Sequence, residues 1–151
     1  MTTLIKPQGC TNLKLRQLTR LVTQHYDSEV GKVGIKTTQY SLLVYVERLG
    51  PIRPIDLAAS IKMTPSTLTR NLKPLVDAGW ITLFPGIDAR SRLVAITDAG
   101  SAKRTEARRQ WRKAQDGIVQ LLGMNAVVAL HTLIDASIEK LDHVAGEDEN
   151  D

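Results

Sequence analysis

The segment from Thr64 to Gly79 restricts the fold most, because it predicts a helix whose start, two faces and end can all be identified. Thr64 is a favourable N-cap, and Pro65 suits the first helical position, where no backbone N–H is needed. The aliphatic side chains recur every three or four residues on one face, namely Leu68, Leu72, Leu75 and Val76. The other face is polar. Such a helix packs on a core through one side and leaves the other side for a ligand.

The rest of the chain is predicted to be mainly α-helical. Helices are expected over residues 11–31, from Thr37 or Thr38 to Leu49, over a short segment opening at Pro54, from Asp98 towards Leu122, and from near Asn125. Residues 80–84 and 93–97 are typical of two antiparallel strands, and residues 85–92 of a projecting basic loop between them. Inside the polar-faced helix, Pro74 predicts a kink or a weakened last turn.

Short helix, turn, polar-faced helix, strand, basic loop and strand is the order of a winged helix-turn-helix. The expected fold class is mainly α, with a small antiparallel β wing of two or three strands and further helices at both ends. In this fold the second helix enters the major groove of DNA, where Arg70 can donate two hydrogen bonds to a guanine edge and Lys73 can pair with a phosphate. The candidate DNA contacts are Thr64, Ser66, Thr67, Thr69, Arg70 and Lys73 on the helix, with Arg90 and Arg92 in the loop.

Positive charge is concentrated in the same part of the chain. The net charge is +4 at pH 7, yet residues 53–113 hold 12 basic and five acidic side chains, a net charge of +7. This is typical of a phosphate-binding surface, although a solvated basic face has the same composition. Four of the last five residues are acidic, and we expect residues 146–151 to form a disordered tail.

The run Asp88–Gly100 resembles the wing signature of the MarR family, D-x-R-x-x-x-x-x-L-T-x-x-G, with Ile96 in place of the usual leucine. Leu57-Ala58, Leu68-Thr69-Arg70 and Leu75–Ile81 are also similar to the family's pattern. The resemblance covers residues 54–100, and the flanking helices fit it in length and position. It implies a homodimeric transcriptional regulator, usually a repressor, that reads a pseudo-palindromic operator in double-stranded DNA. It also implies that Asp88 holds the wing arginine in place and that Arg90 enters the minor groove.

The outer helices predict a dimer independently of this resemblance. Their apolar stripes are wider than a small winged domain can cover from one side. We expect residues 1–36 and 101–145 to join two copies, with the DNA-binding domain at residues 37–100. Two-fold symmetry would then place two recognition helices about 34 Å apart, one turn of DNA.

Control of DNA binding by a small aromatic or carboxylate effector is the common mode that the resemblance implies. The candidate pocket residues are Arg16, His25, Gln39 and Tyr40, of which Arg16 suits a carboxylate. The alternative is peroxide sensing through Cys10, which lies just before the first helix. Each of these residues is also of a type found as ordinary packed or surface side chains, and both readings stay open. His131–Asp135 and Glu139–His143 favour ordinary helix pairs over zinc, so no metal site is expected.

Several other classes of protein are disfavoured. The sequence contains no glycine-rich phosphate loop, metal-ligand cluster or nucleophile motif, so we expect neither an enzyme nor a cofactor. No run approaches the roughly 20 apolar residues of a membrane span, the N-terminus lacks a secretory pattern, and a single cysteine fits the cytoplasm. A chromatin protein that binds DNA without sequence preference remains the alternative, against which the hydroxyls and Arg70 of residues 65–78 argue.

Overall fold

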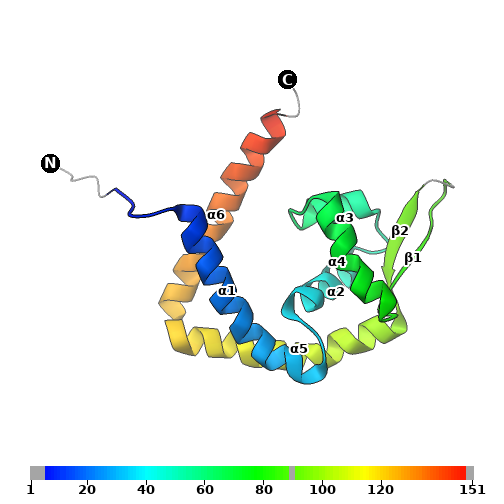
Figure 1. Cartoon of the computed structure of the whole chain (residues 1–151), viewed down its shortest axis with the longest axis horizontal. Coiled ribbons are helices and arrows are strands. Elements are labelled where there is room, and N and C mark those ends of the chain that lie inside the picture. Colours follow the sequence, from blue (N-terminus) through cyan, green and yellow to red (C-terminus); the bar gives the residue numbers. More distant parts are fainter. Residues whose placement is uncertain (1–5, 89–90, 149–151) are drawn as a thin grey trace. The chain divides into compact units, whose positions relative to one another are not determined.

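The structure is a computed structural model that describes residues 6–88 and 91–148 (Figure 1). The described residues form six α-helices and a two-stranded antiparallel sheet, which confirms the expected mainly α fold with a small β wing. In chain order the helices are α1 (Thr11–Val30), α2 (Thr37–Leu49), α3 (Pro54–Ser60), α4 (Pro65–Asp77), α5 (Asp98–Leu122) and α6 (Met124–Asp148). The strands β1 (Ile81–Pro85) and β2 (Arg92–Ile96) lie between α4 and α5. By its internal contacts the chain divides after Ala114 into two compact units.

The core of the first unit is aliphatic and is formed mainly by the winged domain. Its buried side chains come from α2, α3, α4 and both strands, and include Leu42, Leu43, Val46, Leu57, Leu68, Leu72, Leu75, Ile81 and Val94. No polar or charged side chain is buried among the described residues. This core fixes the inner face of α4, since Leu68, Leu72 and Leu75 are each at most 4% exposed.

Helix α4 continues past Pro74 to Asp77, so the weakened last turn expected from the sequence is not observed. Ala78 N still donates to Pro74 O at 3.0 Å. Proline removes only its own N–H, which would have bonded the Arg70 carbonyl, and Pro74 lies on the exposed side of the helix. The buried leucines on the other side therefore hold the helix together.

The wing is a short antiparallel ribbon tied to the domain at its base. Ile81 pairs with Ile96 and Pro85 with Arg92, each strand being displaced by one residue from the expected position. Ile52, just before α3, forms an isolated bridge with Val94, with N···O distances of 3.0 and 2.8 Å. This bridge adds one residue as a third partner to the two-stranded sheet, in agreement with the two to three strands predicted.

The junction between the wing and α5 explains the second half of the Asp88–Gly100 signature. The Thr97 hydroxyl donates to Gly79 O and accepts from Gly100 N at 3.0 Å, which caps α5. A Cβ on Gly100 would lie 2.0 Å from Trp80 O, so only glycine fits there without movement. Thr97 and Gly100 therefore serve the fold.

The second unit contains the end of α5 and all of α6. Gly123, at φ +87°, joins the two helices. Among the aliphatic side chains of this unit, Val127 is 6% exposed, whereas Leu121 and Leu141 are 73% and 71% exposed in the single chain. Helix α6 includes residues 146–148 of the expected tail, and residues 149–151 lie outside the described residues.

Within the described ranges no single helix is long and apolar enough to cross a membrane, although α5 and α6, bent by 106° at their junction, meet the length and composition criteria as a pair.

Candidate nucleic-acid interface

The turn between α3 and α4 fixes the direction of the polar-faced helix. Lys62 adopts a left-handed conformation, with φ of 58°, and Met63 N returns to bond Ala58 O at 2.9 Å. Thr64 then caps α4 by accepting from Thr67 N at 3.3 Å, and Pro65 occupies the first helical position. The predicted start of the helix is therefore correct.

The small hydroxyls at the start of α4 bond mainly to one another. The Thr64 hydroxyl donates to Thr67 Oγ1 at 2.9 Å, and the Thr69 hydroxyl donates to Pro65 O at 2.9 Å. Ser66 Oγ lies 3.3 Å from Thr64 Oγ1. Thr64, Ser66 and Thr69 are exposed, whereas Thr67 is half-buried. Their oxygens keep lone pairs as acceptors, while the hydroxyl donors of Thr64 and Thr69 are engaged within the helix start.

Arg70 and Lys73 differ in how they are held. Arg70 is exposed and has no hydrogen bond or ion pair with another described residue. Lys73 Nζ lies 2.8 Å from Asp77 Oδ2, with both side chains largely exposed. An exposed pair of this kind contributes only about 0.3–0.5 kcal/mol, so Lys73 can exchange Asp77 for a phosphate at little cost.

Two hollows border α4, and Arg70 lines both of them. The larger, of about 480 Å³, lies between α4, the start of α3 and the wing. It is lined mainly by apolar atoms, with Pro54, Leu72, Val76 and Leu83 beside Arg70 and Arg92. The smaller, of about 160 Å³, lies between α4 and the start of α2. Arg70 therefore lies on α4 between the two hollows and contributes to the lining of each.

The described residues on either side of positions 89–90 are joined by hydrogen bonds. Gly86 N donates to Ser91 O at 2.8 Å, and Asp88 O accepts from both Ser91 N, at 3.0 Å, and Ser91 Oγ, at 2.9 Å. The side chains of Asp88 and Arg92 are exposed. Arg90 lies outside the described residues, so its pairing with Asp88 and its contact with the minor groove stay predictions.

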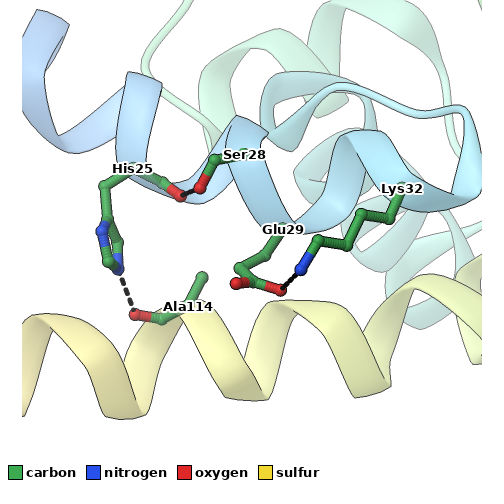
Figure 2. Close-up of polar contacts among 5 residues, drawn as sticks. All are labelled: His25, Ser28, Glu29, Lys32 and Ala114. Atoms are coloured by element: carbon green, nitrogen blue, oxygen red, sulfur yellow. Dashed lines mark hydrogen bonds and ion pairs between the residues drawn. The ribbon is translucent and has the colours of Figure 1, made fainter.

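The four residues predicted to line an effector pocket have different surroundings. His25 Nε2 donates to Ala114 O of α5 at 2.9 Å, since a carbonyl can only accept (Figure 2). Tyr40 is buried and packs on Trp111 of α5, with the two ring centroids 6.2 Å apart. Trp111 precedes Ala114 by three residues in that helix. Burial raises the pKa of the Tyr40 phenol, against the opposing effect of nearby arginines.

The other two candidates have different surroundings. Arg16 is exposed on α1, and Gln39 Oε1 accepts from Lys36 N at 3.0 Å.

Around His25 the polar contacts are local. Ser28 Oγ donates to His25 O at 2.7 Å, and Lys32 Nζ lies 2.9 Å from Glu29 Oε2 (Figure 2). The hydrogen bond from Lys32 is the main reason why the pKa of Glu29 is lowered. Cys10 is exposed at the start of α1 and makes no side-chain cap bond. The structure thus brings His25 and Tyr40 to one helix, α5, and leaves Arg16 and Cys10 at the surface.

Sequence reasoning missed the residues that complete the smaller hollow. Lys36 and Thr38 come from the start of α2, and Asn71 follows Arg70 on α4. The amphipathic pattern of α4 places Asn71 between its two faces, which was the available signal. Nothing in the sequence indicates that the start of α2 lies beside α4.

Comparisons with known proteins agree with this geometry. The sequence model of the MarR family matches residues 35–85. The multiple antibiotic resistance protein MarR of Salmonella typhimurium is 30% identical over 95 residues, which are 60% of this chain and 66% of that protein. The transcriptional regulator MosR of M. tuberculosis, solved in complex with DNA, is 27% identical with a TM-score of 0.70, over 85% of this chain and 98% of that chain. A mutant MarR from E. coli, solved with operator DNA, has a TM-score of 0.75 at 21% identity, over 84% and 92% of the two chains.

Proposed function

This chain belongs to the MarR family of winged-helix DNA-binding transcriptional regulators, and from that premise we propose that it represses transcription as a homodimer bound to a pseudo-palindromic operator. It would act in the cytoplasm. The proposed DNA contacts are Thr64, Ser66, Thr67, Thr69, Arg70 and Lys73 on α4, with Asp88, Arg90 and Arg92 in the wing.

The observation that carries the proposal is the contrast between the two faces of α4. Its leucines are buried in the core, whereas Arg70 is exposed and has no partner among the described residues. An unpaired guanidinium on a rigid helix can form the bidentate contact to guanine O6 and N7 that is the commonest specific contact in the major groove. Because the backbone is held by the core, only the side chain of Arg70 has to be ordered on binding.

Exposed apolar side chains support the proposed homodimer. On α1, Leu13, Leu15 and Leu21 are at least half exposed, and on α6, Leu133 and Leu141 are 67% and 71% exposed. Aliphatic side chains at this density on helices are usually covered by a partner. A two-fold dimer would cover them and set the spacing of the two recognition helices.

We further propose that a small aromatic or carboxylate compound releases the DNA. Its site would lie near α1, α2 and α5 and involve Arg16, His25, Gln39 and Tyr40. The contacts of Tyr40 with Trp111 and of His25 with Ala114 support this, because a ligand that displaced them would shift α5. Such a ligand would act by favouring one of two domain arrangements. A peroxide response through Cys10 is the second candidate, favoured by the exposure of its thiol.

The proposal is tested by fluorescence anisotropy with the DNA upstream of the gene that encodes this chain, beside a scrambled duplex of equal composition. We expect binding to the native fragment to be at least about 10³-fold tighter, as is usual for a specific regulator. Equal binding to every genomic fragment and to the scrambled duplex, with a steep salt dependence, would instead identify a DNA-coating protein. Peroxide added to the native protein and to Cys10→Ser tests the thiol alternative in the same assay.

A further inference from the structure

The smaller hollow beside α4 is lined by two unpaired positive charges. Lys36 and Arg70 both line it, together with Thr38, Gln39 and Asn71, and no carboxylate does. Neither Lys36 nor Arg70 has a hydrogen bond or ion pair from its side chain to another described residue. Two cations beside a polar hollow without a counter-charge repel each other and remain strongly hydrated. An anion in the hollow would relieve both effects.

Several other basic side chains of the same unit have a carboxylate partner. Lys32 pairs with Glu29, Arg53 with Asp56, Lys73 with Asp77 and Lys103 with Glu106, at 2.8–3.0 Å. The two acids that precede Lys36 most closely are already engaged, since Glu29 pairs with Lys32 at 2.9 Å and Asp27 Oδ1 accepts from Thr37 N at 2.7 Å.

The dimensions and donors of the hollow suit one phosphate group. Its volume of about 160 Å³ corresponds to roughly five water molecules at ~30 Å³ each. Ammonium, guanidinium, hydroxyl and amide groups are the donors that contact phosphate oxygens in protein–DNA complexes. The hollow is open to solvent, as a site for a group on a continuous backbone must be. Leu42 and Pro74 complete its lining.

Its position beside α4 identifies the source of that phosphate. A recognition helix in the major groove is bordered on both sides by sugar–phosphate strands. We propose that Lys36 and Thr38 bind one backbone phosphodiester of the bordering strand in this hollow, next to Arg70. This inference rests on the proposed DNA-binding function and adds a contact from α2, outside the helix-turn-helix and wing. Lys36 would then contribute affinity without reading sequence.

Lys36→Gln tests the contact, with Lys32→Gln as the matched control that removes the same charge four residues earlier. Loss of one phosphate contact at 0.15 M salt should weaken binding about fivefold per site, equally on operator and scrambled DNA. The slope of log K against log salt should fall by about 0.9 per site. Equal effects of Lys36→Gln and Lys32→Gln would overturn the inference, since the loss would then reflect net charge alone.

A second measurement distinguishes the DNA backbone from a free anion. Single phosphates of the operator are replaced by neutral methylphosphonates, and binding of the native protein and of Lys36→Gln is compared at each position. One position per half-site should weaken the native protein and leave Lys36→Gln unaffected. If no position behaves so, while inorganic phosphate perturbs the Lys36 resonances of the DNA-free protein, the hollow is a free-anion site and the inference is wrong. If the native protein bound operator and scrambled DNA equally well, the proposed function would be refuted, independently of the Lys36 result.

Discussion

Arg70 carries the clearest prediction at the scale of single residues. It is exposed and unpaired within the described chain, so Arg70→Ala should leave the free energy of unfolding nearly unchanged. If its guanidinium reads a guanine, the variant should lose roughly 1–3 kcal/mol of operator binding and tolerate substitution at one base pair per half-site. Binding to a panel of single-base operator variants measures this. A loss of equal size on every sequence would assign Arg70 to the phosphates instead.

Lys73 serves as the contrasting control for Arg70. It is four residues from Asp77 and pairs with it at 2.8 Å. A lysine directed to a phosphate weakens binding on all sequences alike, so Lys73→Ala should not change the preferred base at any position. The two variants together separate base reading from charge.

At the scale of elements, the junction of β1, β2 and α5 depends on Gly100. A Cβ there would lie 2.0 Å from Trp80 O and 2.8 Å from Ile96 Cγ1, so the backbone or the wing must shift. We expect Gly100→Ala to destabilise the protein by roughly 1–3 kcal/mol, as overpacking does. Gly31→Ala is the control, because its Cβ would meet nothing within 4 Å and its φ of −60° suits alanine. Urea denaturation of both variants compares them, and an unchanged midpoint for Gly100→Ala would contradict this reading of the junction.

At the scale of the whole molecule, the exposed face of α6 predicts the assembly. Leu141 is 71% exposed in the single chain, and a lysine there would place a charge inside the proposed dimer interface. Leu141→Lys should convert dimers to monomers in sedimentation experiments and reduce operator binding at least tenfold, because one half-site is then bound alone. Thr132→Lys, on the opposite side of the helix, adds the same charge and should remain dimeric. A native protein that is monomeric at micromolar concentrations would contradict the dimer itself.

The sequence alone determined the elements of this protein, because their signals are local. The cap at Thr64, the leucine period of α4, the alternation of the strands and the glycine at position 79 each depend on neighbours within a few residues, and the structure has helices and strands at these places. The wing signature was recognisable for the same reason. The predicted continuation of α4 past Pro74 is confirmed, and the weakened last turn is not observed, since buried leucines on the far side of the helix outweigh one missing hydrogen bond.

Only the tertiary structure decided which residues from distant segments meet. Lys36 and Arg70 are 34 positions apart in the sequence, and they line one hollow because α2 and α4 pack on a shared core. His25 reaches the carbonyl of Ala114 across 89 positions in the same way. The non-polar contacts that bring distant segments together are not directional. A hydrophobic pattern therefore predicts that a helix face is buried, but it does not predict which element covers that face. For that reason the sequence could predict α4 as the DNA-reading helix, and the fold was needed to reveal the phosphate-sized hollow beside it.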